Sequence, residues 1–423
     1  MIACTRRALR ELASGTISDT AFRHMPLHTG LPVANDVSRL RFQGLTQKQL
    51  VDALEKDGVA VVTDVFPKPA CDAFRKGMVD DFYSCHKNWP DHKLPGIDGN
   101  GLFKFFGIPL SEHCQAVRAH PNVTKLGQLL YGVENPNDLV VSLDAPAVGS
   151  EARSGKPPAR GDPYFGGSTL KPHVDMAISL NPKKRYASET LTSYLQKRKR
   201  ENNDDTSYGF PVQMQVLAMD QTPFVMKNGQ QGAAPSLVAA LGWHTKLPLR
   251  EGGRKEDFRI LEDHSELMSV WPHLRFIPAE QGCVVLWDSR LPHCSYRGDP
   301  GHPAYEDGLC RLAQMVCYAP KEAREDDELV RKLVCFGEKF EEAVLKRVKR
   351  DGDDREIPKE GASTTHWPHM VKQEGPGHMS NSVNEWTIDK KTKEPKRVKQ
   401  RPGMWKMLEA KRRRLTEPQR NLL

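Results

Sequence analysis

The sequence lacks any long apolar run, and its longest ones are short stretches such as Val59–Val62 and Cys283–Trp287. A helix that crosses a bilayer needs roughly 18 or more consecutive apolar residues, so we expect no membrane-spanning segment and no membrane partner. Repeats with a period of about 20 to 50 residues are also missing, which excludes solenoids and propellers. The composition, with 38% hydrophobic residues among 423, is globular and leaves room for roughly two to three domains, or for one large domain with extensions.

Paired cysteines are missing as well. The nine cysteines include no C-x-x-C pair, and Cys283, Cys310 and Cys317 lie inside apolar runs. An odd number of cysteines in such positions is typical of reduced thiols, so we expect an intracellular protein, cytoplasmic or nuclear. The N-terminus has three arginines in its first ten residues but no secretory apolar region. An organellar destination is therefore an alternative.

Charge is distributed unevenly along the chain. The net charge is +8, yet Lys390–Leu423 alone has 13 basic and three acidic residues, a net of +10. Before this tail, apolar residues at helical spacing predict an amphipathic helix over 321–350 that packs on the main body. We therefore expect an N-terminal extension over 1–40, a main domain over 41–320, that packed helix, and a connector with a basic tail over 351–423.

Within the main domain, helices precede strands. The segment Leu45–Asp57 combines a Thr46 cap with helix formers and ends at Gly58, which predicts a helix that leads into the strand Val59–Thr63. A second helix is predicted over Pro69–Cys85. Apolar and β-branched residues predict further strands at Asp138–Asp144, His173–Leu180, Val212–Met219, Gly282–Trp287 and Leu309–Tyr318. The polar segment between the second and third of these is expected to be an exposed insertion.

A histidine and an aspartate two residues apart, His173 and Asp175, lie on one of these strands. Residues i and i+2 of a strand point to the same side and can hold one metal ion. The other H-x-[D/E] pair, His264 and Glu266, lies in a helix-like segment where such residues diverge by about 200° and cannot chelate together. The first pair is therefore the candidate metal site.

A third ligand comes from the segment Gly282–His293, in which an apolar strand ends in a polar turn that delivers one histidine. Two histidines and one carboxylate form the facial triad of Fe(II) oxygenases, which leaves coordination positions open for a co-substrate and O2. On the next strand, Arg311 is a single arginine among apolar residues. A buried guanidinium needs an anionic partner, and the C5 carboxylate of 2-oxoglutarate is a suitable one.

Residues 45 to 320 or so resemble the phytanoyl-CoA dioxygenase family of Fe(II)/2-oxoglutarate oxygenases. The features that carry the resemblance are Lys56–Val62, the pair of His173 and Asp175, the turn Asn228-Gly229, the segment Gly282–His293 and Arg311. The resemblance implies a mainly β fold with flanking helices and a double-stranded β-helix core, the jelly roll shared with cupins.

The resemblance also implies roles for individual residues. His173, Asp175 and His293 correspond to the iron ligands, and Arg311 to the residue that binds 2-oxoglutarate. Ser295 corresponds to a second group on the same carboxylate. Arg297 competes with Arg311 on the sequence alone, but it lies in a turn, where we expect it to face solvent.

Three more residues are candidates for a substrate pocket. Gln213 and Gln215 alternate with apolar residues, so their side of the strand is either solvated or lines the cavity beside the metal. Trp287 is expected to pack in the core or at the rim of this cavity. The neighbouring Asp288 is expected to form a turn rather than to act as an acid.

The function implied is a dioxygenase that uses Fe(II), 2-oxoglutarate and O2 to hydroxylate a small organic substrate, with release of succinate and CO2. Ascorbate is a candidate additional reductant, and the Asp175 carboxylate favours hydroxylation over halogenation. One alternative is an oxidative demethylase or hydroxylase of nucleic acid, because Lys411–Arg414 and the rest of the tail are strongly basic. Another is a cupin-like barrel that binds metal without catalysis.

Overall fold

The structure is a computed structural model. It describes residues 32–85, 102, 108–142, 144–150, 172–175, 191–192, 212–225, 229, 231–247, 259–261, 264–296, 298, 308–320, 386–388 and 395–397. Most of the predicted insertion, the predicted helix over 321–350, Asn228 and Arg297 lie outside these residues. Of the basic tail only 395–397 is described, so the nucleic-acid alternative stays a prediction.

A six-stranded sheet forms one half of the molecule, in the order β1-β2-β12-β6-β14-β4. Its strands are β1 (Ser38–Arg41), β2 (Val59–Thr63), β12 (Val284–Asp288), β6 (Val212–Leu217), β14 (Leu309–Val316) and β4 (Pro146–Ser150). The edge strand β1 is parallel to β2, and all other neighbours are antiparallel. Because β1 begins at Ser38, this sheet includes residues that precede the boundary expected at residue 41.

A five-stranded antiparallel sheet forms the other half, in the order β10-β5-β13-β9-β11. Its strands are β10 (Arg259–Ile260), β5 (His173–Val174), β13 (His293–Tyr296), β9 (Ser236–Ala240) and β11 (Leu274–Phe276). Three two-stranded ladders pair β15 (Tyr318–Pro320) with β3 (Leu139–Val141), β7 (Pro223–Val225) with β8 (Gln231–Ala233), and β16 (Trp386–Ile388) with β17 (Pro395–Arg397).

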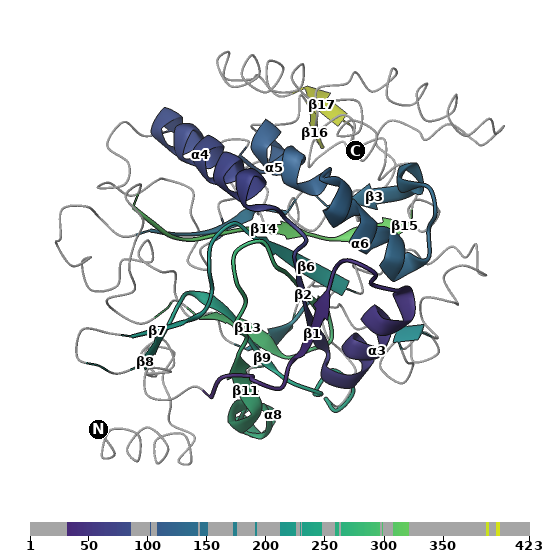
Figure 1. Ribbon diagram of the computed structural model, residues 1–423, viewed down its shortest axis with the longest axis vertical. Helices are drawn as coiled ribbons and strands as arrows, with labels where there is room; N and C mark the ends of the chain where they lie inside the picture. Colours follow the sequence, from purple (N-terminus) through teal and green to yellow (C-terminus); the bar gives the residue numbers. More distant parts are fainter. Residues whose placement is uncertain are drawn as a thin grey trace.

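Helices cover the outer face of the six-stranded sheet. They are α3 (Gln47–Asp57), α4 (Lys68–Cys85), α5 (Glu112–Arg118) and α6 (Pro121–Tyr131), with α8 (His264–Val270) beside the other sheet and short 3-10 helices at Ile108–Leu110, Pro136–Asp138 and Trp271–His273. In Figure 1, α4 and α5 lie above β14 and β6, α6 lies to the right of these strands, and β13, β9 and β11 lie below. Leu54, Met78 and Leu126 of the helices share one apolar cluster with Met214 and Leu286 of the sheet.

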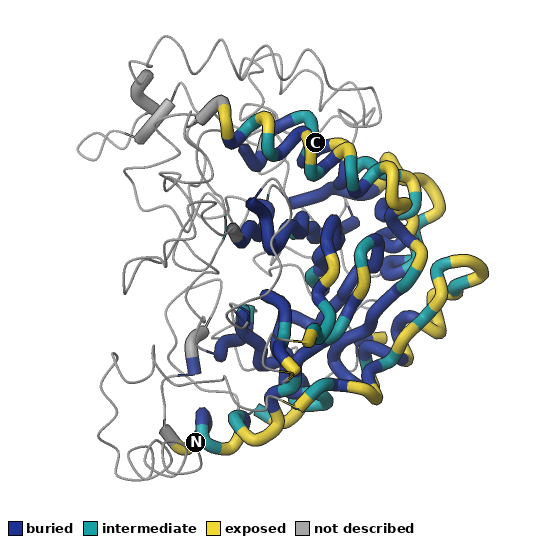
Figure 2. The backbone as a smooth tube through the Cα atoms, turned by 60° about the vertical axis from the view of Figure 1, so that its left-hand side comes forward, coloured by how far each residue is buried: buried dark blue, intermediate teal, exposed yellow. Residues whose placement is uncertain are grey.

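A second apolar cluster fills the space between the two sheets. Val61, Val285 and Ala313 of the six-stranded sheet meet Leu237 and Ala239 of β9 in this cluster. Figure 2 shows buried chain running through the strands and exposed residues along the outer rim of helices and turns. The structure is therefore mainly β with flanking helices and several antiparallel sheets, as predicted. The double-stranded β-helix connectivity stays a prediction.

The junction of α3 and β2 packs against the loop that follows β12. Thr46 caps α3 in a capping box, and the helix ends at Gly58, whose φ is 74°. A Cβ atom at Gly58 would lie 2.7 Å from His244 Nδ1 and from Leu291 Cδ1, so only glycine fits there without displacing them. The Gly58 carbonyl accepts a hydrogen bond of 2.9 Å from the Asp288 amide.

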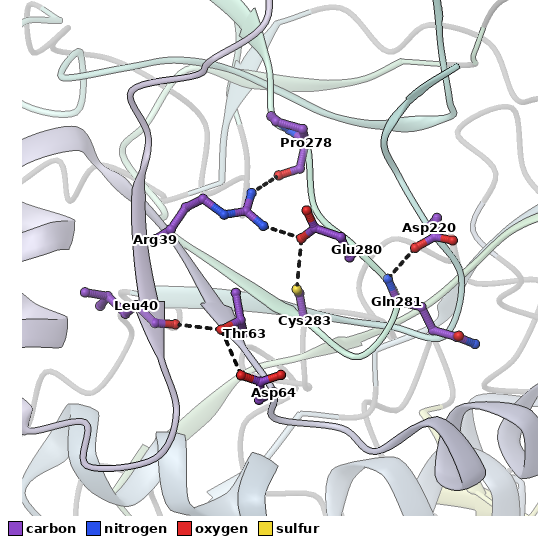
Figure 3. Close-up of polar contacts among 9 residues, drawn as sticks. All are labelled: Arg39, Leu40, Thr63, Asp64, Asp220, Pro278, Glu280, Gln281 and Cys283. Carbon is purple, nitrogen blue, oxygen red and sulfur yellow. Dashed lines mark hydrogen bonds and ion pairs between the residues drawn. The ribbon is translucent and has the colours of Figure 1, made fainter. Parts of the chain in front are cut away.

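Polar contacts fix the turn that leads into β12 (Figure 3). Arg39 of β1 forms an ion pair with Glu280, and the same carboxylate accepts a hydrogen bond of 3.5 Å from the Cys283 thiol. The Gln281 backbone amide donates a hydrogen bond to the Asp220 carboxylate at 2.7 Å. These contacts tie β1, the turn after β6 and the start of β12 together.

Among the described residues, no helix combines the length and apolar character needed to cross a bilayer. Six cysteines are buried free thiols, as predicted: Cys71, Cys114, Cys283, Cys294, Cys310 and Cys317. The compartment stays a prediction.

Candidate metal centre

Two histidines meet at directly opposed positions of the five-stranded sheet. His173 of β5 pairs with His293 of β13 in the antiparallel register, and their ring centroids lie 4.3 Å apart. Directly opposed residues of an antiparallel pair project to the same face of a sheet. Both side chains are buried, with 7% and 5% of their surfaces exposed. The sheet therefore brings together two imidazoles from segments 120 residues apart in the chain.

Asp175 completes the group just beyond the end of β5. Its backbone amide donates to the Ser289 carbonyl at 2.9 Å, which ties this residue to the loop after β12. Asp175 Oδ1 lies 3.4 Å from His173 Nε2, and Oδ2 lies 3.0 Å from His293 Nε2. Burial opposes ionisation of the carboxyl group, but the nearby imidazoles of His293 and His173 attract the carboxylate and hold its pKa well below its usual range.

The tautomer of His293 follows from its second contact. His293 Nδ1 lies 2.8 Å from the Leu291 carbonyl oxygen. A carbonyl can only accept a hydrogen bond, so Nδ1 carries a proton and Nε2 is the ring nitrogen left to face Asp175. Nε2 lies 3.0 Å from Asp175 Oδ2. At that distance a proton or a cation has to lie between the two atoms.

The amide of Gln213 holds the other side of the Asp175 carboxylate. Gln213 Nε2 donates to Asp175 Oδ2 at 2.7 Å. The side chain comes from β6, where Gln213 lies opposite Trp287 of β12 in the register. Sequence alone left open whether this side of β6 is solvated, and the contact resolves the question: it faces the space between the sheets.

The donor set fits a divalent transition metal. One nitrogen from each histidine and one carboxylate oxygen all lie within 4.8 Å of one another. Two ligand atoms about 2.1 Å from a metal ion, at right angles to each other, are about 3 Å apart, close to the Asp175 contacts described above. Two neutral imidazoles and one carboxylate suit iron and its neighbours better than calcium or magnesium, which prefer oxygen donors only.

Arg311 lies in the same interior with its charge uncompensated by the described residues. It is only 7% exposed, and its Nη2 donates to Gln215 Oε1 at 3.5 Å. No carboxylate of the described residues forms an ion pair with it, and its Nε has no hydrogen-bond partner there. Burial lowers the pKa of this guanidinium to about 10, which still leaves it cationic at pH 7.

Gln221 Nε2 and Trp287 Nε1 also lack a hydrogen-bond acceptor within the described part of the chain. Trp287 is buried, and its ring lies 5.5 Å from that of His293, between centroids. Buried donors are normally paired, so we expect a ligand or ordered water to supply these acceptors.

Two residues from the sequence analysis remain to be placed, Ser295 and Asp288. Ser295 is half-buried on β13, two residues after His293 and on the same side of that strand, with Leu237 as its partner in the β9 ladder. Asp288 holds the Arg290 guanidinium through hydrogen bonds of 2.9 and 2.6 Å and accepts from the Arg290 amide at 2.8 Å. It therefore shapes the turn, as predicted.

Gln221 and Ser289 lie close to these groups but were not predicted from the sequence. Gln221 lies in the turn after β6, and a glutamine in a polar turn has no pattern that distinguishes it. Ser289 contributes through its backbone carbonyl, so its side chain carries no signal. The pairing of β5 with β13, which brings these parts together, is likewise not encoded in any local pattern.

Comparisons with known proteins give only distant structural likenesses. The chain matches no protein-family model and no curated protein sequence. Hypothetical protein JW0805 from Escherichia coli is 13% identical, covering 87% of this chain and 85% of that one with a TM-score of 0.41. GlcNAc Inducible Gene 2 (DUF1479) from Candida albicans is also 13% identical, with coverages of 88% and 83% and a TM-score of 0.40.

A third structure is HygX from Streptomyces hygroscopicus, solved with nickel, 2-oxoglutarate and hygromycin B bound. It is 16% identical and covers 65% of this chain and 88% of that one, with a TM-score of 0.35. At such low identity and TM-score, the function of this chain has to be inferred from its own residues.

Proposed function

We propose that this protein is an Fe(II)/2-oxoglutarate-dependent dioxygenase that hydroxylates a small organic substrate. His173, Asp175 and His293 would hold the iron, and Arg311 would bind the distal carboxylate of 2-oxoglutarate. The narrower assignment to the phytanoyl-CoA dioxygenase family depends on sequence motifs and belongs to the same proposal. The observation that carries it is the convergence of His293 Nε2 and Asp175 Oδ2 at 3.0 Å, with the other nitrogen of His293 committed to a carbonyl.

The distance between the two binding elements supports the choice of co-substrate. Gln213 contacts Asp175 and Gln215 contacts Arg311, and these glutamines are two residues apart on β6. Two residues of a strand span about 7 Å. The four C–C bonds of 2-oxoglutarate, each about 1.5 Å, separate its carboxyl carbons by about 5 Å. A five-carbon keto diacid can therefore reach from a metal at the triad to the guanidinium.

The chain's own part in the reaction is binding and orientation. When bound, Fe(II) with 2-oxoglutarate and O2 supplies the oxidation: one oxygen atom enters a substrate C–H bond as hydroxyl, the other enters succinate, and CO2 leaves. The Leu291 carbonyl holds the Nδ1 proton of His293, and Gln213 orients Asp175. The apolar side chains between the sheets keep bulk water away from the reacting groups.

The test is binding first and turnover second. The purified protein is titrated with Fe(II) and 2-oxoglutarate without oxygen, and the visible charge-transfer band of the ternary complex is recorded. Turnover of 2-oxoglutarate to succinate is then measured with Fe(II), ascorbate and O2. We expect both signals in the wild type and neither in His173→Ala, whereas the matched variant His273→Ala, outside the metal centre, keeps both.

A wild-type protein that binds Fe(II) but gives neither the band nor succinate would contradict the proposal. It would favour the non-catalytic metal-binding barrel.

A further inference from the structure

A row of three buried side chains, Arg311, Gln215 and Gln221, crosses the interior beyond the metal centre. Each is at most 7% exposed. Arg311 Nη2 donates to Gln215 Oε1 at 3.5 Å, and Gln215 Nε2 donates to Gln221 Oε1 at 3.5 Å. Gln221 Nε2 ends the row without an acceptor among the described residues. The amide N–H groups thus point away from the guanidinium, and no acid among the described residues ends the row.

The far end of the row is fixed to the backbone. Gln221 exchanges two backbone hydrogen bonds with Ala279, of 2.8 and 3.1 Å. Gln215 is fixed by β6, where it lies opposite Val285 and Met315. A guanidinium cannot accept a hydrogen bond, so its contact with Gln215 forces the amide oxygen toward Arg311 and the amide nitrogen toward Gln221.

We propose that Gln215 and Gln221 are positioning residues that orient Arg311 through neutral amides and so leave its charge free for the carboxylate end of an anionic ligand. This inference rests on the proposed function and specifies how the distal end of the co-substrate is selected. A carboxylate at position 215 would pair with the guanidinium, and the anion would then compete with a fixed internal charge. The amide gives the same geometry without that competition.

The decisive variant is Gln215→Glu, which keeps the shape of the side chain and adds a charge. We expect its dissociation constant for 2-oxoglutarate, with metal bound, to rise at least about tenfold, because Arg311 is already paired. The preference for 2-oxoglutarate over its neutral 5-amide should shrink by a similar factor. Metal affinity should not change. Gln128→Glu adds the same charge on α6, away from the interior, and should bind as the wild type does.

Melting temperature supplies a readout that does not depend on the co-substrate. A buried carboxylate without a partner strongly destabilises a protein, whereas one that pairs with an uncompensated guanidinium does not. We therefore expect Gln215→Glu to melt no lower than the wild type. Gln221→Glu, one step further from Arg311, should melt lower and weaken 2-oxoglutarate binding less.

The outcomes separate the two proposals. A Gln215→Glu variant that binds 2-oxoglutarate like the wild type, or that melts well below it, would overturn the role of the row. If the wild type binds metal but no 2-oxoglutarate, the proposed function fails. The melting comparison then still decides whether Gln215 faces an uncompensated guanidinium.

Discussion

The two faces of the six-stranded sheet come from alternate residues of the same strands and differ in nearly every property. On β6, Met214 and Val216 belong to the apolar cluster beneath the helices. Their neighbours Gln213 and Gln215 face the five-stranded sheet and hold Asp175 and Arg311. One face is mainly apolar, and the other carries polar and charged side chains. Within one strand, we therefore expect alternate residues to serve stability and binding.

This division has a physical reason. The outer face meets amphipathic helices, which bury apolar surface and contribute most of the hydrophobic stabilisation. The inner face meets a second sheet, and small residues such as Ala239 and Ala313 leave room there for larger polar groups. Burying a charge such as that of Arg311 lowers the stability of the protein, and apolar burial on the outer face has to offset this loss. Substitutions on the two faces should therefore separate stability from binding.

The largest effect is expected on the outer face. Met214→Ala removes a fully buried side chain from the cluster beneath the helices and should lower the free energy of unfolding by about 2–5 kcal/mol. Urea denaturation measures this change. Fe(II) affinity under native conditions should stay within about twofold of the wild type. A large loss of metal affinity with stability retained would show that the two faces are not separate in function.

On the inner face, Arg311→Met should do the opposite. It removes a buried charge that no described carboxylate pairs with, so stability without ligand should not fall. Affinity for 2-oxoglutarate should fall about 100-fold, equivalent to about 2.7 kcal/mol. Anaerobic titration measures the affinity, and Arg275→Met on β11 is the control because that guanidinium donates to the backbone carbonyls of Pro272 and Leu274. Unchanged 2-oxoglutarate binding would remove Arg311 from the site.

A smaller effect on the same face concerns the metal. Gln213→Leu removes the hydrogen bond to Asp175 Oδ2 and should weaken Fe(II) binding by about 10- to 100-fold. Melting temperature without metal should change little, because the side chain is half-buried and outside the apolar cluster. Competition with a metal indicator gives the affinity. If Gln213→Leu binds Fe(II) as tightly as the wild type, the amide contact is incidental.

Helices and individual candidate residues were easier to predict from the sequence than the way the chain brings them together. The helix ended by Gly58 is confirmed, because caps and helical periodicity are local signals. The strand predicted over Asp138–Asp144 is shorter, covering Leu139–Val141, and a separate strand begins at Pro146. Strand β9, which lies between β13 and β11, was missed because its apolar residues show no alternation. Sheet order and the Gln213 contact depend on long-range pairing, which no local pattern encodes.

The smallest effect is expected at the boundary between the faces of β13. Ser295 and His293 share one side of this strand, whereas Cys294 belongs to the apolar cluster on the other. If the Ser295 hydroxyl donates to the co-substrate carboxylate, Ser295→Ala should raise the dissociation constant of 2-oxoglutarate by about 2- to 10-fold, since one hydrogen bond contributes about 0.5–1.5 kcal/mol. Melting temperature should not change.

The adjacent variant Cys294→Ser is the matched control for that measurement. It puts a hydroxyl where a buried thiol packs among Val238, Phe276 and Tyr296, so it should destabilise the protein and leave 2-oxoglutarate affinity unaltered. If instead Cys294→Ser weakens binding and Ser295→Ala lowers stability, the division between faces is limited to the six-stranded sheet. If both variants behave as expected, the division extends to both sheets, and the metal centre lies between two inner faces that both serve binding.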